Sequence, residues 1–198
     1  MQPSKNSDLY LQYTGLYLSL RNVINSSNAR VIANEPDQLF IDNVNFFVKS
    51  YLISICSYLE AYLQDIAFKH SVNISNRLSS VGIPHNFVHW RLNTGLKDKY
   101  FNYENLSLDV TKKDISDNIS ANPYRTLKLF QFLGIDLSRK DDFEKYKHII
   151  NTIVTKRNNI VHHNDRAADI SFSDLLVYID VVIPYMNAVK EAVDEVTQ

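Results

Sequence analysis

The chain has 198 residues, of which 45% are hydrophobic and 22% are charged, and its formal net charge at pH 7 is −1. This composition excludes a disordered chain, and the length suits one domain with a substantial core. The near-zero net charge argues against bulk electrostatic binding of long DNA. Glycine (4 residues) and proline (5 residues) are scarce, which favours long helices over turn-rich all-β folds.

The sequence gives no sign of secretion or of a membrane span. The N-terminal stretch MQPSKNSD lacks the apolar segment of a signal peptide. The longest uncharged apolar run is roughly SYLISICSYL, which is too short for a bilayer, since a transmembrane helix needs about 20 residues. Cys56 is the single cysteine, so no internal disulfide can form. We therefore expect a cytoplasmic protein with no membrane partner.

The first part of the chain predicts two helices. Aliphatic residues recur with helical spacing from about Asp8 to Asn25, and the segment Ser26 to Pro36 has the composition of a loop. Asp37 is a good N-cap for a second, long helix that continues to about His70. Its middle is apolar nearly all round, which is typical of a helix at the centre of a bundle or in an oligomer interface.

Residues 71–121 show no consistent periodicity. We interpret them as an irregular insertion between bundle helices of a single domain that spans residues 1–198. Within the insertion, Pro84 is positioned to open a short helix that includes Trp90. The sequence does not decide whether aromatic or histidine side chains of this segment contact a substrate.

Two more helices follow the insertion. Asn122-Pro123 is an N-cap followed by proline at the first helical position, and Gly134 is a suitable residue to end that helix. The next helix begins at Ser138 or Asp141 and leads directly into Arg157. Its apolar stripe has helical spacing and consists of Phe143, Tyr146, Ile149, Ile150, Ile153 and Val154.

The last predicted helix is capped by Ser171 or Ser173 and is expected to kink at Pro184. The elements together predict an all-α, antiparallel bundle of four to five main helices. Charge is unevenly distributed along it: residues 121–166 contain 9 Lys or Arg against 5 Asp or Glu, whereas residues 169–198 contain 1 against 6. The basic segment favours a small anionic target.

The basic segment contains the stretch TKRNNIVHHND, residues 155–165. On a helix Asn158 and His162 share a face, whereas Arg157 and His162 are five residues and about 140° apart. Arg157 and His162 can therefore converge on one anion if the helix unwinds near His162 or if the long arginine side chain bridges the difference. A helix C-terminus favours a protonated histidine, and that histidine beside an arginine suits a phosphate and general acid catalysis.

The same residues also fit an ordinary helix end. Lys, Arg and His are common there because they compensate the helix dipole and cap carbonyls. A zinc site is disfavoured, because the adjacent side chains of His162 and His163 splay apart and Cys56 is far away in sequence. We expect no metal and no cofactor.

The stretch RNNIVHH resembles the R-x4–6-H motif of the HEPN superfamily, with Arg157, a following asparagine, an apolar pair and His162. The segment SYLEAYLQDI in the long helix and the later HNDRAADISFSDLLVYI resemble the bacterial HEPN branch called RiboL-PSP-like. Residues 71–121 carry no such resemblance. The resemblance to the HEPN superfamily implies an α-helical bundle that dimerises, so that two motifs face each other in one composite site.

Many members of the superfamily are metal-independent endoribonucleases, often in toxin–antitoxin or anti-phage systems. The resemblance implies that His162 acts as general acid or base and that Arg157 stabilises the charge on the phosphorane. It implies that Asn158 orients His162 or binds a phosphate oxygen.

Three further residues are candidate supporting groups. Glu60 is expected to pair with Arg157 if the two long helices pack together, and is otherwise a partly exposed glutamate. His163 is either a second proton-transfer group or an exposed neighbour. Asp165 either orients a histidine or forms a turn or cap after the helix.

The leading hypothesis is a homodimeric HEPN-type endoribonuclease whose partners are RNA, a second copy of the chain, and an antitoxin or companion defence protein. The alternative is a non-catalytic HEPN-like module that binds a nucleotide, an RNA or a protein. A third interpretation is an antitoxin-like or purely structural bundle, against which the intact motif argues.

Overall fold

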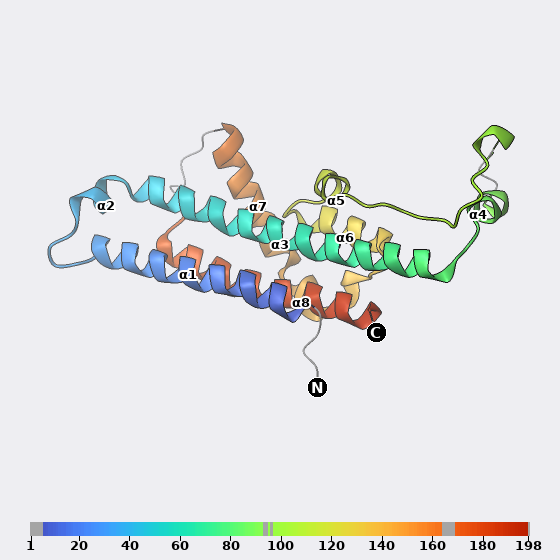
Figure 1. The fold of residues 1–198 in the computed structure, drawn as a ribbon. Coiled ribbons are helices and arrows are strands. Elements are labelled where there is room, and N and C mark those ends of the chain that lie inside the picture. The colour runs from blue at the N-terminus through green and yellow to red at the C-terminus, as the bar shows by residue number, and fades with distance from the viewer. Residues whose placement is uncertain (1–5, 93–94, 96, 164–168, 198) are drawn as a thin grey trace.

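The structure is a computed structural model that describes residues 6–92, 95, 97–163 and 169–197. All regular secondary structure in these residues is helical (Figure 1), which confirms the all-α prediction. The four long helices of the bundle are α1 (Ser7–Val31), α3 (Val44–Val81), α7 (Asp141–His163) and α8 (Phe172–Val196).

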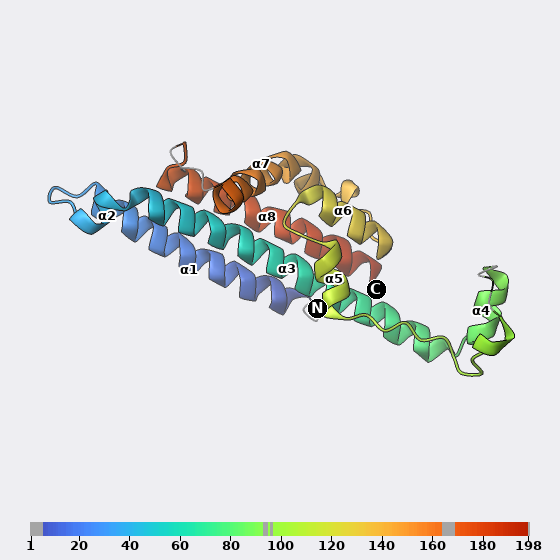
Figure 2. The same ribbon diagram turned by 90° about the horizontal axis from the view of Figure 1, so that it is seen from above.

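α1, α3 and α8 pack side by side, and α7 crosses α3 and α8 obliquely (Figures 1 and 2). Asn6, which precedes α1, donates a hydrogen bond of 2.7 Å to Asp194 near the end of α8, so these two helices are antiparallel. Tyr62 of α3 donates to the carbonyl of Met186 in α8 at 2.9 Å. α3 and α8 run in the same direction, and α7 lies across both in the opposite direction.

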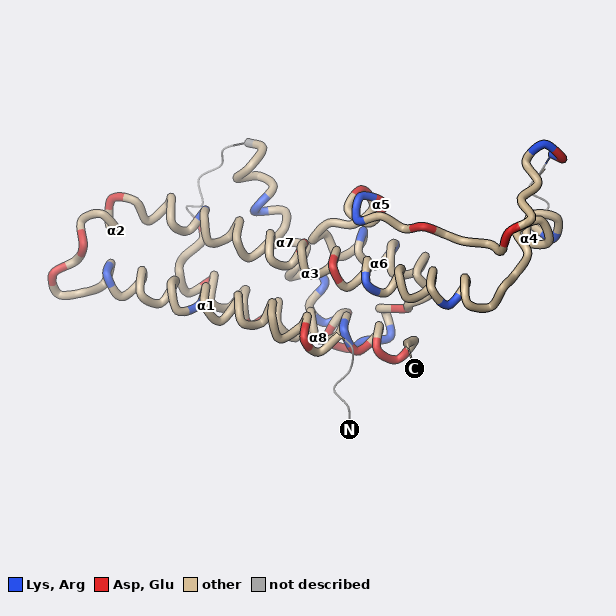
Figure 3. The backbone as a smooth tube through the Cα atoms, in the orientation of Figure 1, with Lys and Arg blue, Asp and Glu red and all other residues tan. Residues whose placement is uncertain are grey.

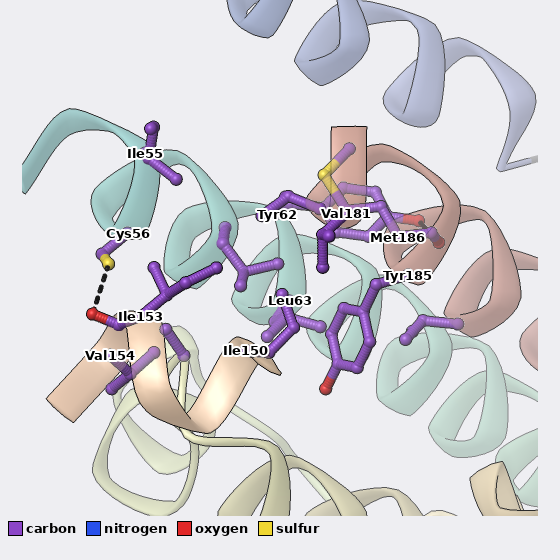
Figure 4. Packing of buried hydrophobic residues seen from close by; sticks show 14 of the residues in the cluster. Ile55, Cys56, Tyr62, Leu63, Ile150, Ile153, Val154, Val181, Tyr185 and Met186 are labelled. Atoms are coloured by element: carbon purple, nitrogen blue, oxygen red, sulfur yellow. Dashed lines mark hydrogen bonds between the residues drawn. The ribbon is translucent and has the colours of Figure 1, made fainter. Parts of the chain in front are cut away.

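The core is shared by all four helices and contains aliphatic side chains together with buried tyrosines (Figure 4). Tyr17 and Tyr62 are fully buried, and each donates its hydroxyl to a backbone carbonyl of another helix. A hydrogen-bonded tyrosine contributes apolar contact area without leaving a polar atom unsatisfied. These pairs therefore fix the register of α1 against α3 and of α3 against α8.

The first helix is longer than its apolar pattern predicts. α1 continues to Val31, and the predicted loop therefore begins six residues too early. The hydroxyls of Ser26 and Ser27 donate to the carbonyls four residues before them, which lets serine remain in a helix. Ser27 also lies 2.7 Å from the hydroxyl of Tyr51 in α3, so a contact between helices stabilises this extension.

The second predicted helix is two helices in the structure. Asp37 caps the short α2 (Gln38–Asp42), as predicted, by accepting from the backbone N–H of Leu39. α3 begins after Asn43 and extends 11 residues beyond His70 to Val81. His70 and Ser71 are buried, so the bundle covers the helix where the pattern suggests that it ends.

The rest of the segment 71–121 leaves the bundle and returns along it. The short helix predicted after Pro84 is confirmed as α4 (His85–Arg91), which lies with the 3-10 helix Asp98–Tyr100 beyond the end of α3 (Figure 2). Neither contains a buried residue. α5 (Lys112–Asn118) then packs on α3 and contributes Ile115 to the core.

The helix boundaries after residue 121 follow the capping residues. Asn122 accepts from two backbone N–H groups at the start of α6 (Pro123–Phe132), which Gly134 (φ 78°) follows in the left-handed conformation. Of the two predicted starts for α7, Asp141 is correct, and a short 3-10 helix, Leu137–Arg139, precedes it. Ser171 is the cap of α8 and forms a capping box with Asp174.

α8 is the most apolar of the long helices. By length and composition alone it could cross a membrane, but half of its most apolar window is buried in the bundle. Its buried residues contact α1, α3 and α7, and helices at the centre of a bundle commonly have this composition. α8 contains Pro184 within its helical span, and the kink expected there stays a prediction.

Candidate active site

Arg157 lies near the end of α7, and its guanidinium points at α3. Its Nη2 donates to Oε2 of Glu60 at 2.9 Å, so the expected ion pair between the two helices is present. The Arg157 side chain is 20% exposed and the Glu60 side chain 30% exposed. A pair this sheltered is screened less by water than a surface pair, and it restricts the rotamers of the arginine.

Asn158 provides a second hydrogen bond to the arginine, whose Nε is buried and has no partner among the described residues. Its Oδ1 accepts from Nη1 of Arg157 at 3.0 Å. Both η nitrogens of Arg157 are therefore engaged, one by the neighbouring amide and one by Glu60. The predicted roles of Asn158, orienting His162 or binding a phosphate oxygen, stay predictions, whereas its contact with Arg157 was not anticipated.

His162 lies on a different side of the helix from the arginine. α7 is helical through His163, so the unwinding that would let Arg157 and His162 converge within one chain does not occur. The side chain of His162 is exposed, whereas Arg157 faces α3. The side chain of His163 and the whole of Asp165 lie outside the described residues, and their predicted roles stay predictions.

Cys56 lies beside Arg157 in the core. Its thiol is 4.0 Å from the carbonyl oxygen of Ile153 on α7 (Figure 4). Burial raises the pKa of Cys56 to about 12, and the neighbouring guanidinium of Arg157 opposes this rise only in part. The thiol is protonated at neutral pH, so Cys56 is a packing residue here and not a nucleophile.

A second ion pair ties the end of α7 to the chain just before α8. Lys156 pairs with Asp169, and this contact raises the pKa of the lysine and lowers that of the aspartate. Sequence reasoning missed the pair, because 13 residues separate the partners and no helical spacing relates them. The pair spans residues 164–168 and holds together the two ends of the connection after the motif.

The two pairs change the charge expected from the sequence. Lys156 and Arg157 form the basic band near the end of α7 (Figure 3), but a carboxylate opposes each of them. The count of basic residues therefore overstates the positive charge that one chain offers to an anion at this site. A phosphate bound here needs positive groups beyond those of a single chain or competes with Glu60 for Arg157.

The described residues contain no group of three or more His, Cys, Asp or Glu side chains that could hold a metal ion. The candidate site thus consists of a guanidinium, an amide, a carboxylate and an imidazole at the end of one helix.

A family model described as RiboL-PSP-HEPN matches residues 18–195, which include the motif, the second half of α1, all of α3 and α7, and nearly all of α8. The chain belongs to the RiboL-PSP-HEPN family. The match also covers residues 71–121, in which sequence reasoning found no resemblance. HEPN domains generally cleave RNA or interact with it, and they often dimerise. No curated protein and no solved structure matches the chain.

Proposed function

We propose that the protein is a metal-independent endoribonuclease that acts as a homodimer. The observation that carries the proposal is the arrangement on α7. A guanidinium held by Glu60 and Asn158 precedes an exposed imidazole, His162, by five residues on an unbroken helix. One chain directs these two groups about 140° apart, so a shared phosphate site requires residues from two chains.

The proposed reaction is an internal transesterification of RNA. One imidazole removes the proton of the ribose 2′-hydroxyl, and the 2′-oxygen forms a bond to the adjacent phosphorus. The bond from phosphorus to the 5′-oxygen breaks, and a second imidazole donates a proton to that oxygen. The products are a 2′,3′-cyclic phosphate and a 5′-hydroxyl, and no oxidant, water or metal is consumed.

In a dimer the two His162 side chains supply the acid and the base. Arg157 stabilises the extra negative charge on the phosphorane, and Glu60 and Asn158 limit its movement. Val161, beside His162, has an exposed apolar side chain, which provides contact area for a second copy at this end of α7. DNA has no 2′-hydroxyl and is not a substrate in this mechanism.

Purified protein incubated with tRNA and with generic RNA tests the proposal. We expect cleavage with and without EDTA, cyclic phosphate ends, and loss of cleavage in His162→Ala and Arg157→Ala. His85→Ala is the matched control, since His85 lies on α4 at the far end of α3. Size-exclusion chromatography should show dimers for all variants. Cleavage that disappears with EDTA, or that persists in His162→Ala, contradicts the mechanism.

The second candidate is a non-catalytic module that binds RNA, a nucleotide or a protein. The engagement of both η nitrogens of Arg157 by Glu60 and Asn158 favours it, because a phosphate would have to displace one of these contacts. RNA binding without cleavage, unchanged in His162→Ala, would support the module and exclude the enzyme.

We further infer, from the resemblance to the HEPN superfamily, a cytoplasmic role in a toxin–antitoxin or anti-phage system. A specific antitoxin or companion protein should then bind the dimer and suppress its cleavage of RNA. Expression of the protein alone should slow the growth of its host, and His162→Ala should remove that effect.

A further inference from the structure

α5 and α6 lie next to each other (Figures 1 and 2). Residues of both helices line a pocket of about 220 Å³ that shares no residue with the candidate active site. Its lining residues are Asn118, Arg125, Lys128, Leu129 and Phe132. Two of these side chains are cationic, and no acidic residue belongs to the described lining. Such a pocket attracts an anion, because nothing in its wall neutralises the two positive charges.

The two cations of the pocket differ from the two beside the motif. Lys156 and Arg157 each face a carboxylate, Asp169 and Glu60 respectively. In the part of the chain that the structure describes, neither Arg125 nor Lys128 has an ion-pair partner. Arg125 is held at one end, since its Nη2 donates to the backbone carbonyl of Asp117 at 3.3 Å. This hydrogen bond restrains the guanidinium on one side, and no carboxylate of the described residues neutralises its charge.

Exposed aromatic rings flank the cations on the same helix. Phe132 is 74% exposed and Tyr124 is 48% exposed. Positions 124, 125, 128 and 132 recur at helical spacing, so they form one face of α6. Cations that bind phosphates beside rings that stack on bases are the two features of surfaces that bind single-stranded nucleic acid.

The end of this face that carries Tyr124 contacts α7, the helix that carries the candidate active site. The hydroxyl of Tyr124 lies 3.3 Å from Nδ1 of His148 on α7. From that point the exposed positions 152, 155, 159 and 162 of α7 follow at helical spacing. The distance along the helix axis from His148 to His162 is about 21 Å. A flexible strand can span it.

We propose that this pocket, the α5–α6 pocket, binds two adjacent backbone phosphates of single-stranded RNA whose scissile bond lies at His162. The assignment of RNA as the ligand rests on the proposed function. Arg125 and Lys128 each contact one of these phosphates, and Phe132 stacks on an adjacent base. The pocket binds the RNA at a distance from the scissile bond. It therefore contributes to the affinity for long RNA and takes no part in the cleavage step.

The test measures binding of a labelled single-stranded RNA of about 20 nucleotides, at about 0.05 to 0.2 M salt, to the full chain carrying His162→Ala. Two contacts to phosphates of a single strand change the slope of log K against log salt by about 1.4. Arg125→Gln with Lys128→Gln should therefore lower that slope by about 1.4 and weaken binding about 25-fold at 0.1 M salt. The matched control is Arg91→Gln with Lys97→Gln. It removes the same charge from the segment around α4, beyond the end of α3, and should change neither the slope nor the affinity.

Phe132→Ala separates stacking from charge. It should weaken RNA binding about 10-fold and leave the salt slope unchanged, because base stacking does not release counterions. Circular dichroism and thermal melting verify the fold of each variant. If the double variant is unfolded, each single substitution should still lower the slope by about 0.7.

The outcomes separate this inference from the proposed function. If wild-type protein cleaves RNA but the double variant binds RNA like its parent, the pocket assignment is wrong and the enzyme stands. If no cleavage occurs but the double variant binds RNA more weakly, the enzyme is wrong and the pocket stands. Inorganic phosphate that binds the pocket in an Arg125- and Lys128-dependent way, with RNA binding unaffected, identifies a small-anion site and overturns the assignment.

Discussion

Replacement of Glu60 by glutamine removes one negative charge from a sheltered ion pair and keeps the shape of the side chain. The amide oxygen of the glutamine can still accept a hydrogen bond from Arg157, which lies 2.9 Å from Glu60 in the native protein. Arg157 stays charged in the variant, so its hydrogen bond to the amide remains a bond to a charged group. What is lost is the attraction between opposite charges, which at 4 Å is about 1 kcal/mol in water and about 4 kcal/mol at an effective dielectric constant of 20. The substitution also leaves a mostly buried guanidinium without a counter-charge.

We expect Glu60→Gln to lower the free energy of unfolding by about 2 kcal/mol and the melting temperature by about 4–8 °C for a chain of this size. Urea unfolding and calorimetry measure the two quantities. Glu195→Gln is the control, because Glu195 pairs with Lys140 but its side chain is 67% exposed. Exposed pairs contribute about 0–1 kcal/mol.

A double-mutant cycle with Arg157→Gln isolates the pair itself. The coupling free energy between Glu60 and Arg157 should be about 1–2 kcal/mol. If RNA cleavage is observed, Glu60→Gln should also lower its rate about 10-fold, because a positioning residue acts on orientation. A loss of stability no greater than that of Glu195→Gln, together with zero coupling, refutes the reasoning that Glu60 holds Arg157.

Two further predictions concern the bundle. Tyr62→Phe should lower the free energy of unfolding by about 0.5–1.5 kcal/mol in urea titrations, because it removes the buried hydrogen bond from Tyr62 to the carbonyl of Met186. An unchanged value would mean that this hydrogen bond makes no net contribution to stability. Ser171→Ala should cost about 1 kcal/mol through loss of the cap of α8. The hydrogen bonds from Ser171 lower the pKa of Asp174. The stability that ionised Asp174 contributes is therefore fully present above about pH 4 and is lost as the pH falls through the lowered pKa. The free energy of unfolding of Asp174→Asn should consequently depend less on acidic pH than that of the wild type.

Capping chemistry made the later helix boundaries predictable. A capping residue bonds to backbone groups only a few positions away, so the sequence alone shows where it starts or ends a helix. This holds for Asn122-Pro123, Gly134 and Ser171. The ends of α1 and α3 were predicted too early, because no local signal continues those helices. Packing extends them: Ser27 reaches Tyr51 on another helix, and His70 is buried by the bundle.

The candidate site likewise has features that the sequence predicted and others that it did not. The spacing of Arg157, Asn158 and His162 and the resemblance to the HEPN superfamily identify the motif from sequence. The pairing of Lys156 with Asp169 and the α5–α6 pocket were not predicted, because each joins residues whose separation carries no periodic signal.

The sequence by itself determined that the chain is all-α, which family it belongs to, and which residues form the motif. These properties depend on local periodicity, caps and short-range spacing. Only the tertiary structure decided that carboxylates neutralise the basic residues beside the motif and that Arg157 and His162 face different directions on an intact helix. Both depend on which helices pack together, and that is set by the contacts of the whole bundle.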